Sequence, residues 1–122
     1  MKTRFEVFGA SLACLWMSRE DGSVELLANY PEEVSYPQEI VVRWDESPEG
    51  QGPTERAIRM GVPQVMNDIS TDSTFLPWRG LARKTGRIAS SAAFPLITSG
   101  RTFGALNLYS NKKAFLILIR NG

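Results

Sequence analysis

The sequence predicts a single α+β domain over residues 1–122, built on a central antiparallel sheet with helices packed on its faces. Two observations predict this class. First, the turn residues Asp21-Gly22 and Ser99-Gly100 each separate two apolar runs, as the loops of β-hairpins do. Second, two segments between these hairpins have helical periodicity, and each begins at a proline and ends at a glycine: residues 53–61 and 77–86.

The first hairpin is predicted to pair residues 11–17 with residues 24–30. Both runs are apolar, and the polar segment between them contains the Asp-Gly pair. Residues 31–38 are polar and contain two prolines, which predicts a loop. Residues 40–44 are either a strand or an extended link, and the Pro- and Gly-containing residues 46–52 are a second loop.

The first helix is predicted to begin at Pro53, where a missing backbone N–H costs nothing, and to stop at Gly61 in the left-handed conformation. Residues 62–69 are predicted to form a short buried strand. The second helix is predicted to begin at Pro77 and to stop at Gly86. Each helix has one face of apolar or small residues: Thr54, Ala57 and Ile58 in the first, and Trp78, Leu81, Ala82 and Thr85 in the second.

The second hairpin is predicted to pair residues 88–97 with residues 101–110. A two-residue loop would place Ala93 opposite Leu106, whereas a three-residue loop ending at Gly100 places Ala93 opposite Ala105. Glycine in the third position favours the second register, with Gly100 at positive φ and Ser91 opposite Asn107. Because side chains alternate along a strand, this register gives one face of mostly small residues. That face carries Ala89, Ser91, Ala93, Pro95, Ala105, Asn107 and Tyr109, with Phe103 at its hairpin end.

The composition limits the chemistry that the chain can perform. It contains no histidine, which removes the most common general base and the usual proximal haem ligand. Its single cysteine, Cys14, allows no intrachain disulfide and no cysteine zinc site. The net charge of +1 gives no electrostatic reason to expect a nucleic acid or an anionic membrane as partner. We therefore expect a cytoplasmic protein without metal or cofactor; the apolar run after Lys2 is short for a signal peptide.

Over about half of the chain, the order and spacing of several short motifs resemble a GAF domain. These motifs are Gly52-Pro53-Thr54, Ala57-Ile58-Arg59, Gly61, Val65-Met66-Asn67-Asp68-Ile69, Phe75-Leu76-Pro77-Trp78-Arg79, Ala92-Ala93-Phe94-Pro95-Leu96 and Gly104-Ala105-Leu106-Asn107-Leu108-Tyr109-Ser110. The resemblance covers residues 52–110 best. It implies a GAF/PAS-like sheet with a ligand cleft on one face, and a regulatory role in bacterial signal transduction.

Most signatures of specialised GAF subfamilies are absent. Phytochrome-like and haem-binding members need histidine, and members that reduce free methionine sulfoxide use several cysteines. The cyclic-nucleotide motif begins at Asn111-Lys112 and Phe115 but lacks its acidic pair. The resemblance therefore favours a small-molecule-sensing domain that is not an enzyme. The alternatives are a ligand-free dimerisation module and, less favoured, an enzyme of the methionine-sulfoxide-reducing kind.

A ligand cleft is predicted on the small face of the second hairpin. Its predicted lining is Asp68, Phe75, Trp78, Leu81, Ser91, Ala93, Asn107 and Tyr109. Two of these residues have structural alternatives, since Asp68 could cap the following turn and Trp78 could be a core aromatic residue. Ser91, Asn107 and Tyr109 favour a polar-lined pocket, because buried polar groups are rarely left unpaired.

The opposite face of the second hairpin is apolar and carries Phe94, Leu96, Leu106 and Leu108. The resemblance implies long terminal helices that cover this face, and neither end of the chain predicts one. The apolar tail, residues 114–120, is a buried strand, a helix enclosed by a partner or the product of an altered reading frame. We therefore expect a fragment of a larger sensor that forms a homodimer through this face and the tail.

Overall fold

The computed structural model describes the backbone of residues 3–8, 10–86, 88–113 and 116–121, and the side chains of residues 10–86 and 88–113. Its strands are β1 (Thr3–Phe8), β2 (Ala10–Ser18), β3 (Val24–Tyr30), β4 (Gln64–Met66), β5 (Ser90–Thr98), β6 (Arg101–Ser110) and β7 (Leu116–Asn121). Its helices are α1 (Tyr36–Glu39), α2 (Pro53–Met60) and α3 (Leu76–Thr85), with 3-10 turns at Pro48–Gly50 and Ser73–Phe75.

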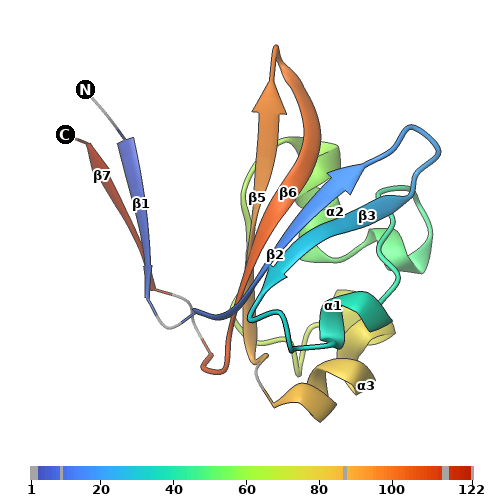
Figure 1. Cartoon of the computed structure of the whole chain (residues 1–122), viewed down its shortest axis with the longest axis vertical. Helices are drawn as coiled ribbons and strands as arrows, with labels where there is room; N and C mark the ends of the chain where they lie inside the picture. The colour runs from blue at the N-terminus through green and yellow to red at the C-terminus, as the bar shows by residue number, and fades with distance from the viewer. Residues whose placement is uncertain (1–2, 9, 87, 114–115, 122) are drawn as a thin grey trace.

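Five of the strands form one antiparallel sheet in the order β3-β2-β6-β5-β4 (Figure 1). This arrangement confirms the predicted α+β class. Both predicted hairpins form, and β2 pairs with β6 so that the two hairpins share one sheet. In the first hairpin, Gly22 has φ 91°, and Asp21 Oδ1 accepts hydrogen bonds from the backbone N–H and the hydroxyl of Ser23.

The helix boundaries are close to those predicted from proline and glycine. Pro53 lies in the first turn of α2, and Gly61 ends it at φ 68° while donating its N–H to the Ala57 carbonyl at 2.9 Å. Pro77 lies in the first turn of α3, and Gly86 follows that helix at φ 64°. These local signals need no tertiary information, because proline and left-handed glycine act through backbone sterics alone.

Two predicted strands differ from the structure. The predicted buried strand at residues 62–69 is reduced to β4, in which Val65 is 49% exposed and Met66 is buried. Strand β4 lies at the edge of the sheet, so it has a neighbouring strand on one side only. Val65 lies beside Ala92 on the sheet face that no described helix covers, and its side chain therefore stays exposed. Residues 40–44 form no strand and are an extended link, with a single bridge between Arg43 and Ser23.

The predicted register of the second hairpin is wrong by two residues. Ala93 pairs with Asn107, and neither Ala105 nor Leu106 is its partner. The loop has two residues, Ser99 at φ 51° and Gly100 at φ 73°, which confirms only the predicted positive φ of Gly100. The register shifts between Leu96 and Ile97, where Leu96 pairs with Gly104 and Ile97 with Thr102, so the extra residue lies inside the strand.

This bulge keeps the predicted face intact even though the partners change. Ser91 pairs with Tyr109 instead of Asn107, and Pro95 pairs with Ala105. Because a shift of two residues preserves the alternation of side chains, the small residues still share one face. That face is the inner face of the sheet, against which α2 packs at β5 and β6.

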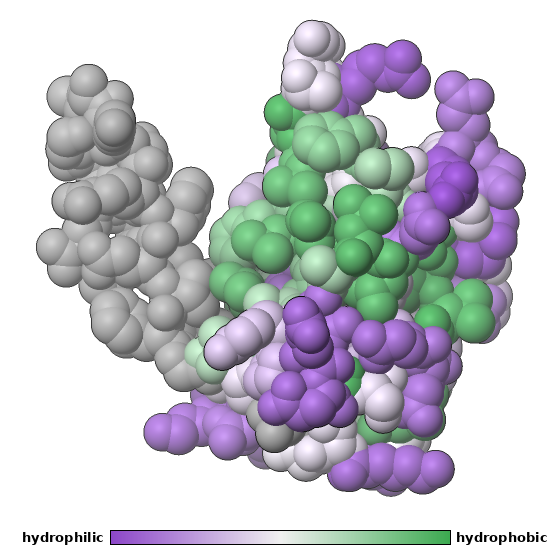
Figure 2. All heavy atoms as spheres, viewed as in Figure 1, coloured by the Kyte–Doolittle hydropathy of each residue, from purple (hydrophilic) through white to green (hydrophobic). Residues whose placement is uncertain are grey.

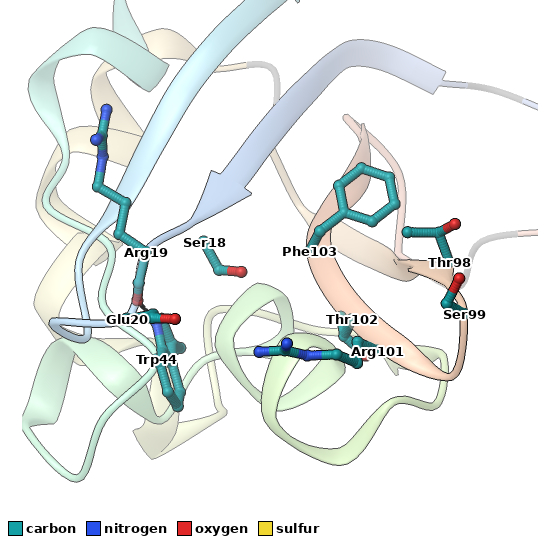
Figure 3. Close-up of a pocket in the computed structure, with 9 residues that line it drawn as sticks. All are labelled: Ser18, Arg19, Glu20, Trp44, Thr98, Ser99, Arg101, Thr102 and Phe103. Atoms are coloured by element: carbon teal, nitrogen blue, oxygen red, sulfur yellow. Dashed lines mark hydrogen bonds between the residues drawn. The ribbon is translucent and has the colours of Figure 1, made fainter.

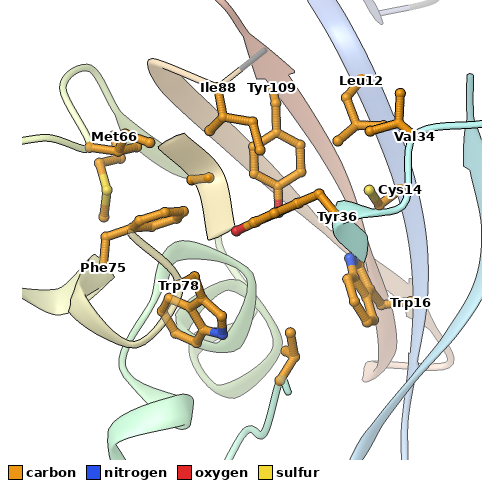
Figure 4. Close-up of a cluster of buried hydrophobic side chains, with 13 residues drawn as sticks. Leu12, Cys14, Trp16, Val34, Tyr36, Met66, Phe75, Trp78, Ile88 and Tyr109 are labelled. Carbon is orange, nitrogen blue, oxygen red and sulfur yellow. The ribbon is translucent and has the colours of Figure 1, made fainter. Parts of the chain in front are cut away.

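The core lies between this inner face and the helices α1 and α3 (Figure 4). Strand β2 contributes Leu12, Cys14 and Trp16, and the helical side contributes Tyr36 and Trp78, all of them buried. The opposite, outer face of the sheet is only half-buried at its apolar positions: Phe94, Leu96, Leu106 and Leu108. Figure 2 shows hydrophobic residues gathered over the strands on the face seen there.

The two ends of the chain form a separate two-stranded sheet. Strand β7 pairs antiparallel with β1, from Phe8 opposite Leu116 to Thr3 opposite Asn121. Of the three predicted states of the apolar tail, the backbone of residues 116–120 therefore adopts the strand, and residues 114 and 115 lie outside the described residues.

Candidate functional site

A small internal cavity lies between the inner face of the sheet and the helical layer. Its volume is about 10 Å³, which is about the space of one water molecule. Residues from every layer of the domain line it: Tyr36, Ile40, Val42, Pro53, Thr54, Glu55, Phe75, Trp78 and Tyr109. The predicted cleft is thus nearly closed in this structure, and only this small, partly enclosed space remains.

Four aromatic rings form most of the wall of the cavity. Tyr36 from α1 and Tyr109 from β6 meet edge to face, with ring centroids 6.0 Å apart. Phe75 and Trp78 meet at 5.4 Å, and the Trp78 Nε1–H donates to the Val41 carbonyl at 2.7 Å. Figure 4 shows the hydroxyl ends of both tyrosines turned toward the space beside Phe75 and Trp78. The Trp78 hydrogen bond holds the loop after α1 against α3.

Glu55 brings a carboxyl group into this aromatic cavity. It lies in the first turn of α2 and is only 2% exposed. Its Oε2 has no hydrogen-bond partner among the described residues. Burial raises the pKa of Glu55 to about 8, and the backbone N–H groups of Glu55 and Gly52 oppose that rise. A Cβ at Gly52 would overlap both this carboxylate and the Trp78 ring, so glycine is required there.

The tyrosine hydroxyls and the neighbouring polar side chains are also incompletely paired. Tyr36 is 2% exposed, and its hydroxyl has no partner among the described residues. The Tyr109 hydroxyl accepts a hydrogen bond from Asn107 Nδ2 at 3.1 Å. Behind it, Asn107 Oδ1 and Ser91 Oγ are buried without partners in the described part of the chain. Such groups are rare in folded proteins, and each one requires an explanation.

The structure brings together three of the predicted site residues at the cavity: Phe75, Trp78 and Tyr109. Ser91, Ala93 and Asn107 share the inner face but are fully buried and do not line it. Leu81 packs against the core and lines two surface hollows, and it does not line the cavity. Trp78 is a core residue, which is its predicted structural alternative, and its contact with a ligand stays a prediction.

Asp68 lies outside the cavity and adopts its predicted structural role. Its Oδ1 accepts hydrogen bonds from the backbone N–H and the hydroxyl of Ser70, at 3.0 and 2.6 Å. Its Oδ2 pairs with Lys113 Nζ at 3.2 Å. The Ser70 hydroxyl is the main cause that lowers the pKa of Asp68. The carboxylate is therefore occupied by the turn that follows β4.

Sequence reasoning missed Tyr36 and Glu55. The only local signal for Glu55 was its place three residues after Gly52, where a glutamate typically belongs to a capping box. Tyr36 lies in a segment that the sequence predicted as loop, and nothing local indicated that its ring is buried. Both residues reach the cavity only through the packing of α1 and α2 against β6.

Larger hollows on the surface lack these features. One, of about 500 Å³, lies between the tips of the two hairpins and is lined by Arg19, Trp44, Arg101 and Phe103, among others (Figure 3). It is open to solvent, and Trp44 Nε1 already donates to the Arg19 carbonyl at 2.5 Å. None of its lining residues is among the buried, unpaired polar groups of the described chain.

The described residues offer little for catalysis or metal binding. Cys14 is 1% exposed, and burial raises the pKa of its thiol to about 12, so it is not a thiolate at neutral pH. No group of three or more potential metal-ligating side chains occurs in the described part of the chain. Within the same residues, no helix is long and apolar enough to cross a membrane.

The GAF domain family model matches residues 3–116, nearly the whole chain. No curated protein sequence matches the chain significantly. Several solved structures share its fold, at identities too low to indicate more than the fold.

A sensor histidine kinase domain from Sinorhizobium meliloti aligns with a TM-score of 0.62 and 19% identity, over 86% of this chain and 64% of that one. The free methionine-R-sulfoxide reductase from Neisseria meningitidis, solved with its substrate, aligns with a TM-score of 0.64 and 18% identity, over 88% of this chain and 56% of that one. The Staphylococcus aureus NreA protein, mutated in its nitrate binding site, aligns with a TM-score of 0.63 and 14% identity, over 84% of this chain and 73% of that one. The chain thus spans less than two thirds of the length of the first two.

Proposed function

Because the chain belongs to the GAF domain family, we propose that it is the non-catalytic, small-molecule-sensing domain of a cytoplasmic bacterial signal-transduction protein. The observation that carries this proposal is the enclosed cavity with unpaired polar atoms of Glu55 and Tyr36 at its wall. Buried polar atoms without partners are costly in a plain core, and a bound ligand would supply the missing partners.

The structure supports a mechanism in which the ligand changes the packing of the helical layer. A ligand larger than one water molecule enters only if α1 and the loop after it move away from Trp78. The hydrogen bond from Trp78 to the Val41 carbonyl is the contact that this movement breaks. A ligand that binds the open arrangement better than the closed one shifts the population toward it and so biases an attached output.

The S. aureus NreA protein has a nitrate binding site, and the N. meningitidis reductase was solved in complex with its substrate, so small-molecule sites occur in proteins of this fold. Reductase chemistry in this chain is disfavoured by its single cysteine, which is buried and protonated at neutral pH. Incubation with free methionine sulfoxide and a thiol reductant is therefore expected to yield no methionine. Turnover that disappears in Cys14→Ser would refute the non-catalytic assignment.

Native mass spectrometry of the protein as purified tests the sensing role directly. We expect a mass excess that disappears under denaturing conditions, or else a thermal shift with at least one member of a broad metabolite library. A protein that carries no excess mass and responds to no library member would instead be the ligand-free interaction module.

The outer sheet face supports a second element of the proposal, which is a homodimer. Leu96, Leu106 and Leu108 are only half-buried there, and Val65 and Met17 lie exposed on the same face. A second copy offers an equally apolar surface, and Glu25, the register partner of Met17, is paired with Arg19, so two copies can cover each other's apolar residues. Light scattering at high micromolar concentration is expected to give a dimer mass, and a monodisperse monomer would contradict it.

A further inference from the structure

The unpaired polar atoms at the cavity wall can all accept hydrogen bonds. Glu55 Oε2 is an acceptor when ionised, and the Tyr36 hydroxyl can accept through its lone pairs. The one indole donor at the wall, Trp78 Nε1, is already bonded to Val41. Among the residues that line the cavity, none is a lysine or an arginine. The cavity therefore lacks the cationic donors that an anion needs, and it suits a group that itself donates hydrogen bonds.

The aromatic rings of the cavity wall also favour a positively charged ligand. The rings of Tyr36, Phe75, Trp78 and Tyr109 line the same cavity as Glu55. Aromatic faces carry negative charge density and attract cations, most strongly where water is excluded. A carboxylate within an aromatic enclosure is a combination that recognises an ammonium group.

The hollow between the cavity and the solvent is lined by negatively charged side chains. An open hollow of about 380 Å³ lies directly outside the cavity and shares Ile40 and Trp78 with it. Glu39 and Glu49 stand on its wall, and no basic side chain lines it. Negative charge at the mouth raises the local concentration of cations and disfavours anions.

We propose that the cavity receives the ammonium head of a small primary amine, with the Glu55 carboxylate as its counter-ion and the Tyr36 hydroxyl as a hydrogen-bond acceptor. The proposal rests on the sensing function and specifies the chemical class of its ligand. A cavity of about 10 Å³ fits an –NH3+ group, which is close to water in size, but not a quaternary ammonium group. The remainder of the amine extends past Ile40 and Trp78 into the acidic hollow.

Binding of this kind is coupled to a proton. In the empty cavity the Glu55 carboxyl stays protonated at neutral pH, because burial raises its pKa to about 8. When the ammonium group enters, the O–H bond of the carboxyl breaks, its proton passes to solvent, and N–H···O hydrogen bonds to the carboxylate take its place; no other covalent bond changes. The groups that act on Glu55 are Tyr36 and Tyr109 across the cavity and, on its own helix, Arg56 and Arg59.

Neither arginine forms an ion pair with Glu55 among the described residues, although both lower its pKa by less than burial raises it. Arg59 Nη1 donates to the Gly50 carbonyl at 2.9 Å. Arg56 also contributes to the lowered pKa of Asp72. Cys14 and the two tyrosines carry raised pKa values and remain neutral at physiological pH.

Isothermal titration calorimetry with methylammonium chloride tests the proposal. Ammonium chloride, tetramethylammonium chloride, potassium chloride, acetamide and sodium nitrate serve as comparison probes at equal ionic strength. We expect methylammonium to bind, ammonium to bind more weakly, and the other four to give no saturable heat. Below about pH 8, the affinity is expected to rise roughly tenfold for each pH unit, because about one proton leaves per ligand bound. The measured heat should then depend on the ionisation enthalpy of the buffer.

Two variants locate the binding site. Glu55→Gln removes the charge and is expected to weaken methylammonium binding at least roughly tenfold and to abolish proton release, and Glu55→Asp is expected to restore part of both. Glu32→Gln, at an exposed glutamate in the preceding loop, is the matched control and should bind as the parent does. Circular dichroism checks the fold of each variant, and the proton release of the parent protein needs no variant at all.

The outcomes separate this proposal from the sensing function. Nitrate or acetamide that binds while methylammonium does not would overturn the ligand class and leave the sensing function standing. Methylammonium binding that Glu55→Gln leaves unchanged, or that releases no proton, would overturn the assigned role of Glu55. A protein that binds no probe, carries no excess mass as purified and responds to no library member would overturn both proposals.

Discussion

Replacing Glu55 with glutamine is expected to remove a strong pH dependence of stability. In the unfolded chain the carboxyl ionises near its ordinary pKa of 4.5, whereas in the folded domain burial raises the pKa to about 8. Between these values the native state holds one more proton than the unfolded state, so the free energy of unfolding falls as pH rises. The stabilising contribution is fully present below about pH 4.5 and is lost as pH rises through about 8.

The size of the effect follows from the same two pKa values. One pH unit corresponds to about 1.4 kcal/mol, so the whole loss approaches about 5 kcal/mol, with about 3 kcal/mol of it between pH 5.5 and 7.5. Glutamine keeps the shape of the side chain but does not titrate. The free energy of unfolding of Glu55→Gln, relative to that of the parent, is therefore expected to increase by about 3 kcal/mol between pH 5.5 and 7.5.

Urea denaturation of the parent, Glu55→Gln and the exposed control Glu32→Gln, at several pH values between about 5.5 and 7.5, measures this difference. The control should follow the parent at every pH. Parallel curves for the parent and Glu55→Gln would show that Glu55 titrates alike in both states. That result would refute its neutral burial in the empty cavity and the proton release proposed for ligand binding.

Four substitutions and one labelling experiment further test the packing. Gly104→Ala is expected to cost about 2 to 4 kcal/mol by thermal denaturation, because its Cβ would overlap a carbonyl oxygen of β2; Gly80→Ala, with open space around it, should be neutral or slightly stabilising. Ala93→Trp, which the sequence alone suggests would fill a cleft, is expected to disrupt the fold, because Ala93 is fully buried where α2 packs on β5; a native circular dichroism spectrum would contradict this. Cys14 is expected to resist a thiol reagent near pH 8 until the protein unfolds, and rapid labelling of the native state would disagree. Leu106→Lys is expected to convert a dimer to a monomer in light scattering, and an unchanged mass would place the interface elsewhere.

The local signals of the sequence predicted most of the fold. The Asp21-Gly22 turn, the prolines at the starts of the helices and the glycines at their ends act within a few residues of themselves. For that reason both hairpins and both longer helices lie close to where they were predicted. The division of the second hairpin into a small and a bulky face was also predictable, because alternation along a strand survives a shift of two residues.

The exact partners in that hairpin were not predictable, because they depend on one extra residue inside β6. The bulge lies where Leu96 pairs with Gly104 and Ile97 with Thr102. Gly104 also pairs with Met17 of β2. Any side chain at position 104 would overlap the β2 backbone, so the neighbouring strand takes part in fixing this geometry. Loop rules that consider one hairpin alone contain no such information.

Some residues of the candidate site were likewise predictable from the sequence, and others were placed only by the structure. Phe75, Trp78 and Tyr109 could be placed at the cleft from the motifs around them, since each lies in or beside a segment of regular pattern. Asp68 showed both of its possible uses in the sequence, and only the structure places it in the turn with Ser70.

The chemistry of the cavity was decided by tertiary structure alone. A glutamate in the first turn of a helix and a tyrosine in a loop are ordinary surface residues in any sequence-based view. Their polar ends become unpaired and buried only because α1 and α2 both pack over Tyr109, a contact between segments that are distant in the chain. Local backbone preferences thus fixed the elements, while long-range burial, which raises the cost of every unpaired charge, determined which polar groups line the cavity.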